Sequence, residues 1–133
     1  MSEPKWIDDR EAVAIQERLV ATLGGLAGGV RDENLFKAAL ARPLNKWHYE
    51  EPQPDFFTLA AAYAFGIAKG HVFHDGNKRT AHAVAFVFLK HNGYTHTPDE
   101  TEVVRVMIGV ADGSISEAEL ATWFRANSRK LKR

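Results

Sequence analysis

Two apolar segments dominate the hydropathy pattern, and both have the character of buried helices. The first covers roughly residues 55–69 and the second roughly residues 77–92. Each carries apolar side chains almost all round rather than along one stripe, which is typical of a helix at the centre of a domain. We therefore predict that these two helices form the core pair of the fold.

Helix start and stop signals predict two helices before this pair. Asp8 is a typical N-cap residue for an apolar-periodic run that ends at Gly24. Asp32 has the same place before a second run, which we expect to end at Pro43 because proline interrupts helical hydrogen bonding. The glycine-rich segment 24–29 is expected to be a flexible turn. A phosphate cradle is disfavoured there, because neither a preceding strand nor the pattern G-x-x-x-x-G-K-[ST] is present.

The segment 43–54 lacks a helical pattern. Its three prolines and clustered aromatic side chains predict a long loop, which can hold a short hairpin flap. Trp47 and Tyr49 either pack down on the domain or line a docking edge for a partner chain.

Two further helices are expected after the core pair. Thr97 is the expected cap of the first, which closes at Gly113, and Ser116 is the expected cap of the second. The basic tail 125–133 is expected to fray. The inner stripe expected for the first of these helices consists of Val103, Val104, Met107, Ile108 and Ala111. No segment shows convincing strand alternation, so we predict an all-α fold, a compact single-domain bundle of five to six helices over residues 1–133.

The amino-acid composition excludes or disfavours several classes of function. The 133 residues include 17 basic and 17 acidic side chains, so no overall field attracts nucleic acid or an anionic membrane. Cysteine is absent, which excludes disulfides and thiol chemistry. The first residues show no signal-peptide pattern, and no apolar run approaches the ~20 residues that span a bilayer. We expect a cytoplasmic protein.

A polar, charge-dense loop, His71-Val72-Phe73-His74-Asp75-Gly76-Asn77-Lys78-Arg79, lies between the core helices. Asn77, Lys78 and Arg79 fall where the second core helix begins, and the first amides of a helix lack internal acceptors and favour anions. Gly76 allows a left-handed turn that can direct successive N–H groups inward. The loop is therefore a candidate site for a phosphate chain, with Asp75 as a candidate ligand of the Mg²⁺ that accompanies it.

His71 lies at the other end of this loop. An imidazole suits the acceptance of a proton from an alcohol near neutral pH, so the loop has the parts of a phosphoryl-transfer or nucleotidyl-transfer site. We expect Phe73 to be buried as the loop's anchor and His74 to face outward without a duty. A plain structural turn remains an alternative, and a zinc site is disfavoured because the other histidines are scattered.

The loop resembles the signature of the Fic/Doc (Fido) family, H-x-F-x-[DE]-[GA]-N-[KG]-R. Lys78 stands where the Fic branch usually has glycine, and this lysine resembles the Doc, or death-on-curing, branch. The likeness extends over nearly the whole chain, including Ala68-Lys69-Gly70-His71 and Leu89-Lys90-His91-Asn92-Gly93-Tyr94. The matching signature positions are His71, Phe73, Asp75, Gly76, Asn77 and Arg79.

The resemblance implies a compact helical toxin of a toxin–antitoxin pair. The Fic branch moves AMP from ATP onto a target hydroxyl. The Doc branch moves a phosphate instead, onto a threonine of the translation elongation factor that delivers aminoacyl-tRNA. By position, His71 would be the base and Asp75 the Mg²⁺ ligand. The implied nucleotide or phosphate contacts are Lys69, Gly76, Asn77, Lys78 and Arg79.

The sequence departs from the Fic pattern at one informative position. His82 stands where Fic proteins often have a second arginine, which agrees with the Doc branch. The family's inhibitory motif, [ST]-x-x-x-E-[GN], does not occur, so the resemblance implies a separate antitoxin. Two alternatives stay open: an AMP transferase acting on a protein hydroxyl, and a catalytically inactive helical interaction module. Balanced charge argues against a helix-turn-helix DNA binder.

Overall fold

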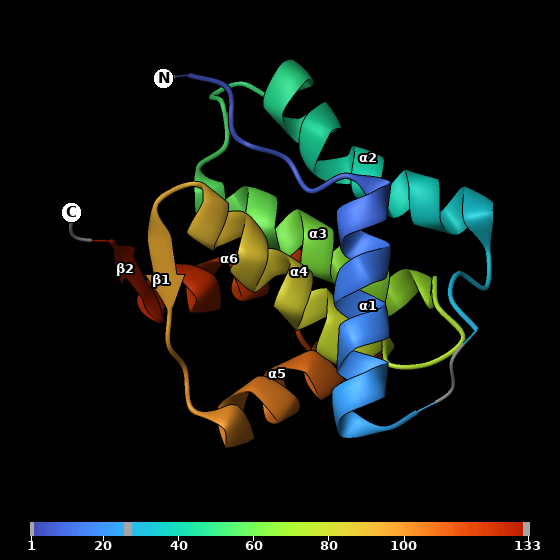
Figure 1. Ribbon diagram of the computed structural model, residues 1–133. Helices are drawn as coiled ribbons and strands as arrows, with labels where there is room; N and C mark the ends of the chain where they lie inside the picture. The colour runs from blue at the N-terminus through green and yellow to red at the C-terminus, as the bar shows by residue number, and fades with distance from the viewer. Residues whose placement is uncertain (1, 26–27, 132–133) are drawn as a thin grey trace.

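The computed structural model describes residues 2–25 and 28–131, where the chain forms six α-helices and two three-residue strands (Figure 1). In chain order they are α1 (Asp9–Leu23), α2 (Glu33–Tyr49), α3 (Phe56–Gly70), α4 (Asn77–His91), β1 (Tyr94–His96), α5 (Glu100–Asp112), α6 (Glu117–Ala126) and β2 (Ser128–Lys130). The all-α prediction is confirmed, although the two short strands were not expected. No helix of the described ranges has the length and apolarity that crossing a bilayer requires.

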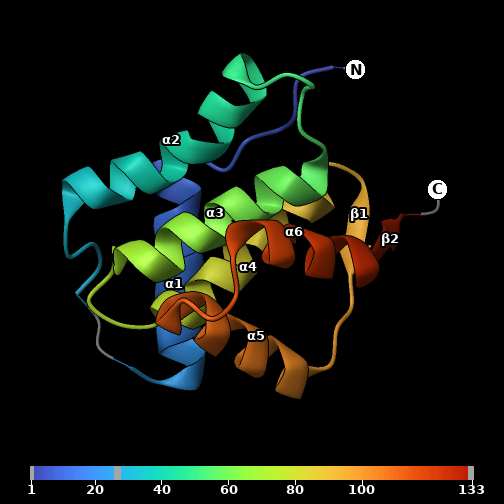
Figure 2. The same cartoon turned by 180° about the vertical axis from the view of Figure 1, so that it is seen from behind.

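The helices α3 and α4 form the centre of the fold, as their hydropathy predicts. α3 packs against α2, α4, α5 and α6. Figure 1 shows α1 crossing in front of α4, and Figure 2 shows α5 and α6 on the opposite side. Small side chains let the helices approach closely, since a Cβ added at Gly66 of α3 would lie 3.2 Å from Ala39 Cα of α2. The alanine-rich sequence of α3 therefore suits both helix formation and a crowded central position.

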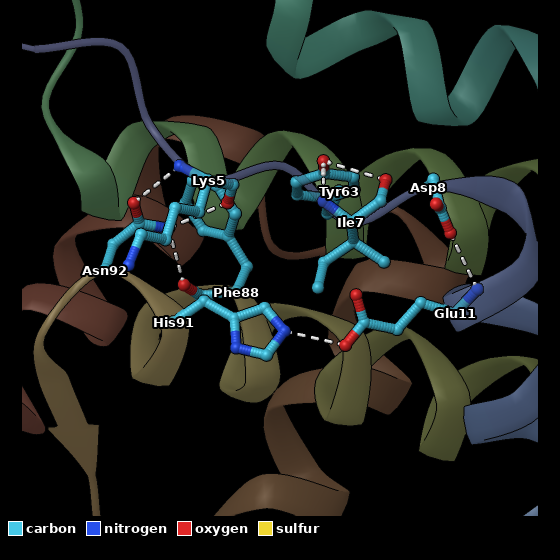
Figure 3. A network of polar contacts seen from close by, with 8 residues as sticks. All are labelled: Lys5, Ile7, Asp8, Glu11, Tyr63, Phe88, His91 and Asn92. Atoms are coloured by element: carbon cyan, nitrogen blue, oxygen red, sulfur yellow. Dashed lines mark hydrogen bonds and ion pairs between the residues drawn. The ribbon is translucent and has the colours of Figure 1, made fainter.

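The segment before α1 is fastened to the core pair by hydrogen bonds (Figure 3). The amide of Ile7 donates to the Tyr63 hydroxyl at 2.9 Å, and that hydroxyl donates to the Ile7 carbonyl at 3.2 Å. The Asn92 side chain forms a similar pair with the backbone of Lys5, at 2.8 and 3.0 Å. Burial raises the pKa of the Tyr63 hydroxyl, so it keeps the proton that it donates. These contacts fix the position of the first residue of α1, and α1 then packs against α4.

α2 continues through Pro43 to Tyr49, so the predicted loop is wrong over 43–49; residues 50–54 are irregular as predicted, and they form no hairpin. Pro43 and Trp47 are four residues apart, and both are buried. Proline removes only one helical N–H, and burying two large side chains on one face compensates for that loss. Figure 1 shows α2 bending along its length, as expected for a helix with an internal proline. Trp47 packs against Trp6, with ring centroids 6.3 Å apart, whereas Tyr49 is 82% exposed.

The chain end is paired rather than frayed as far as Leu131. β1 and β2 run antiparallel, and the Leu131 amide donates to the Gly93 carbonyl at 2.8 Å. At the other end of the pair, the Thr97 amide donates to the Asn127 carbonyl at 3.0 Å. Because Thr97 belongs to this ribbon, it does not cap α5, and Asp99 takes the N-cap position. The end of the predicted tail, residues 132–133, lies outside the described residues, as do residues 26–27 of the glycine-rich turn.

The buried face of α5 differs from the predicted stripe. Val104 and Ile108 were expected to face the core, but they are 57% and 47% exposed. The helix instead turns Gly109 inward, where an added Cβ would lie 2.6 Å from Ile115 Cδ1. A hydropathy pattern does not register a glycine as a core position, yet this glycine is buried against Ile115. The buried residues of α5 are Val106, Met107, Gly109 and Val110.

Candidate active site

The loop between α3 and α4 is held closed by the side chain of Asn77. Its Oδ1 accepts a hydrogen bond from the Phe73 amide at 2.9 Å, and its Nδ2 donates to the Phe73 carbonyl at 2.9 Å. Phe73 is fully buried and packs against Phe36, with ring centroids 5.5 Å apart. The prediction that Phe73 anchors the loop is confirmed. The Asn77 side chain is committed to the backbone of the loop, so a ligand contact of Asn77 through its backbone amide stays a prediction.

His71 is the C-cap of α3, and its backbone is left-handed, with φ 52° and ψ 49°. This conformation costs a residue other than glycine about 1–2 kcal/mol, so neighbouring contacts must hold it. The histidine is exposed, and it lines the pocket described below. The imidazole is therefore accessible to a substrate rather than turned into the core.

The amino end of α4 is open toward the loop. Gly76 precedes the helix with φ 74°, in the left-handed region that the sequence predicts for it. Within the described ranges, no side chain caps the first turn of α4 by a hydrogen bond. Lys78 and Arg79 are both exposed in this turn. Uncapped amides, the positive end of the helix dipole and two cations together form a site suited to an anion.

A concave pocket of about 180 Å³ is formed by the loop and the start of α4. It is lined by His71, His74, Asp75, Gly76, Asn77, Lys78 and Arg79. The structure thus brings together the predicted site residues except Lys69. The ammonium of Lys69 lies toward the end of α5, where a Cβ added at Gly113 would be 3.5 Å from its Nζ. A nucleotide contact of Lys69 stays a prediction.

Asp75 is the acidic residue of this pocket. Its Oδ1 accepts a hydrogen bond from the Gly76 amide at 2.8 Å. In the part of the chain that the structure describes, no group of three or more His, Cys, Asp or Glu side chains could hold a metal ion. Mg²⁺ with a nucleotide needs less, because phosphates and water supply most of its ligands and one or two carboxylates complete the set. Asp75 fits that smaller role, and Mg²⁺ binding stays a prediction.

Two contributions to the site come from outside the loop and were not predicted. The Arg79 guanidinium donates to the Gly24 carbonyl at 3.0 Å, and a Cβ added at Gly25 would lie 2.8 Å from Asp75 Oδ2. The turn after α1 therefore lies directly against the charged side chains. From α1 itself, Gln16 donates to the Asp75 carbonyl at 3.3 Å. A polar residue at a core-facing position in the apolar periodicity of α1 was the sequence signal that could have identified Gln16, which the structure shows to be buried.

A second histidine of the loop, His74, and one histidine of α4, His82, have different surroundings. His74 is exposed, as expected, but it lines the pocket, and its Cδ2 would lie 3.1 Å from a Cβ added at Gly28. His82, at the position of the second Fic arginine, points elsewhere: its Nε2 lies 3.0 Å from His96 Nε2. It is not among the residues that line the pocket.

Replacing Asn77 with alanine is expected to lower the free energy of unfolding by about 2–4 kcal/mol. The substitution leaves the amide and the carbonyl of Phe73 without their partners at a site where Asn77 is only 6% exposed. Urea-induced unfolding measures the change. Asn45→Ala, at an exposed position of α2, is the matched control and should change stability by less than about 0.5 kcal/mol. Equal stability of Asn77→Ala and the parent chain would contradict the role assigned to this side chain.

Comparison with known proteins agrees with the geometry. The profile of the Fic/DOC family matches residues 6–89. Protein kinase doc of Escherichia phage P1 is 34% identical over 121 residues, which cover 91% of this chain and 94% of that protein. Toxin Doc of Mycolicibacterium smegmatis is 42% identical over 78 residues, 56% of this chain and 60% of that protein. The chain therefore belongs to the Fic/DOC family.

Proposed function

We propose that this protein is the toxin of a toxin–antitoxin pair and that it transfers the γ-phosphate of ATP to a serine or threonine hydroxyl of a target protein. The observation that carries the proposal is the pocket that is lined both by His71 and by the uncapped amino end of α4, with Lys78 and Arg79 in its first turn. The names of the two relatives, protein kinase doc and toxin Doc, support the same activity and role.

The reaction assigns a separate task to each group of the pocket. His71 accepts the proton of the target hydroxyl as its oxygen forms a bond to the γ-phosphorus. The bond from that phosphorus to the β-phosphate oxygen breaks, and ADP leaves. The amides of α4, Lys78 and Arg79 bind phosphate oxygens and stabilise the charge that shifts toward ADP. Mg²⁺ bound with ATP neutralises phosphate charge, and Asp75 is the carboxylate that would hold it.

Charge at the start of α4 supports a polyphosphate ligand in particular. Two cations in the first turn of a helix oppose its dipole, and the first turn of α4 has no acidic residue. A bound anion relieves this unfavourable arrangement. Lys78 replaces the glycine of the Fic signature and adds a cation for the transferred phosphate, which favours phosphate transfer over AMP transfer.

The partners follow from the same proposal. The target is a protein that displays a serine or threonine hydroxyl, and we propose a translation elongation factor on the basis of the Doc resemblance. A cognate antitoxin acts in trans, and the activity takes place in the cytoplasm.

Incubation with ATP labelled at either the α or the γ position, together with cell extract, tests the reaction. We expect transfer of label to a protein from γ-labelled ATP and not from α-labelled ATP, and we expect removal of Mg²⁺ by EDTA to stop it. Label from the α position alone would make the protein an AMP transferase. Transfer from neither position, with growth inhibition retained, would instead favour an interaction module.

A further inference from the structure

Arg31 contacts the end of α3 from outside the pocket. It directly precedes Asp32, the N-cap of α2. Its Nε donates to the His71 carbonyl at 2.7 Å, and one terminal nitrogen donates to the Gly70 carbonyl at 3.4 Å. The last carbonyls of a helix have no partner within the helix. Arg31 therefore supplies donors at the point where the chain turns into its left-handed conformation.

The backbone of the same segment holds the other side of His71. The Arg31 amide donates to the Val72 carbonyl at 2.7 Å, and the His74 amide donates to the Gly29 carbonyl at 3.1 Å. Val30 and Phe73 form an antiparallel bridge between these two bonds. Side chain and backbone of this segment thus fix the peptide groups on both sides of His71, which determines the direction in which the imidazole leaves the chain.

The chemistry of arginine suits this place. The carboxyl end of a helix carries partial negative charge, which favours a cation there. A guanidinium presents several N–H groups in a fixed fork, so it can bridge two successive carbonyls, whereas a lysine ammonium acts as a single point charge. Arg31 is not among the residues that line the pocket, so its geometry assigns it to the protein backbone rather than to a phosphate.

We infer that Arg31 is a positioning residue, which holds the His71 imidazole where it can accept the proton of the target hydroxyl. The inference rests on the proposed function, because it takes His71 as the base. It adds that the left-handed turn at His71 is maintained by a residue 40 positions earlier in the chain.

Steady-state kinetics of Arg31 variants test the inference. Arg31→Ala should lower kcat by about 10- to 100-fold, because small displacements of a reacting group have effects of this size. The KM for ATP should stay the same, since the pocket loses no ligand. The kcat of Arg31→Lys should lie between that of the parent chain and that of Arg31→Ala. Arg105→Ala, an exposed arginine of α5, is the control and should leave both constants unchanged. An unchanged kcat, or a raised KM for ATP at constant kcat, would overturn the inference.

A double-variant comparison separates positioning from an independent role. If Arg31 acts through the imidazole, adding R31A to the H71A background should cause no further loss of transfer. A further loss as large as in the parent chain would overturn the inference. If Arg31→Ala fails to fold, Arg31→Lys is used in its place, alone and in the H71A background.

A spectroscopic readout distinguishes failure of the inference from failure of the proposed function. The His71 ring signals in a proton–carbon NMR spectrum, assigned by their loss in H71A, should shift or broaden in R31A. Identical ring signals would overturn the inference whatever the activity. Shifted ring signals in a protein that transfers no phosphate would support the positioning while rejecting the proposed reaction.

Discussion

Replacing His71 with alanine is expected to lower the rate of phosphate transfer by about 10²–10⁴-fold, the usual contribution of a general base. The side chain is exposed at the rim of the pocket and contributes nothing to the core, so the fold should persist. The phosphate contacts at the start of α4 also remain, so the KM for ATP should change little. Single-turnover transfer from γ-labelled ATP and circular dichroism measure the two effects.

The left-handed backbone at position 71 calls for a second variant. Asparagine tolerates this conformation better than alanine does but cannot serve as the base, so His71→Asn should lose as much activity with less effect on stability. His48→Ala is the control, because His48 is an exposed histidine of α2 and does not line the pocket. Transfer and growth inhibition at parent levels in both His71 variants would exclude the catalytic account.

Acidification from pH 7 to pH 5.5 is expected to lower the free energy of unfolding by about 2 kcal/mol, through His82 and His96 together. Burial lowers the pKa of each imidazole to about 4, and for His82 the proximity of His96 adds to the effect. Unfolding returns both groups to the ordinary value near 6.5. Between pH 6.5 and 4 the unfolded chain therefore binds more protons than the folded one, so stability falls as the pH falls through this window.

Burial is the reason that the neutral form of this pair is favoured, and its hydrogen bonds can be formed by two neutral rings. His96 Nδ1 lies 3.2 Å from the Asn127 carbonyl and 2.9 Å from the Ser128 hydroxyl, and we assign the proton to this nitrogen because the carbonyl can only accept. His96 Nε2 is then an acceptor, and His82 Nε2 donates to it at 3.0 Å. Trp123 and Phe124 cover the two rings, and the Trp123 indole donates to Glu102 at 2.6 Å. A proton added to the pair disturbs this pattern in a largely apolar environment.

Urea unfolding at pH 7 and pH 5.5 measures the pH effect. His82→Phe keeps a ring in place and should reduce the pH dependence by about half, since each histidine contributes at most about 1.4 kcal/mol per pH unit. His48→Gln, which alters an exposed histidine, should keep the full dependence. Equal unfolding free energies of the parent chain at the two pH values would show that the pair is not held neutral.

Periodicity and capping residues were sufficient to predict most of the helical fold. Asp8, Asp32 and Ser116 are N-caps as predicted, because their side chains accept amide hydrogen bonds locally. The failures occurred where distant contacts override local signals. Burial against the core carries α2 through Pro43, and pairing with the chain end removes Thr97 from the start of α5.

The candidate site was likewise predicted where it depends on local sequence and missed where it depends on distant contacts. The loop signature identified the residues that surround the pocket, since nine consecutive positions contain them all. It did not reveal the supports from Gln16, Gly24 and Arg31, because each contacts the loop or its border across 39 or more positions of sequence. Hydropathy and motif patterns describe neighbours along the chain, and these contacts arise only when α1 and the segment before α2 are in place.

The antiparallel contact of residues 29–31 with residues 72–74 has a consequence for recognition by other molecules. The conformation of the loop depends on a distant stretch of backbone as well as on Asn77, so a synthetic peptide copying residues 71–79 would not reproduce it in isolation. Antibodies raised against such a peptide would bind the denatured chain in preference to the native one. An inhibitor that mimics the loop would likewise need a covalent brace in place of Arg31.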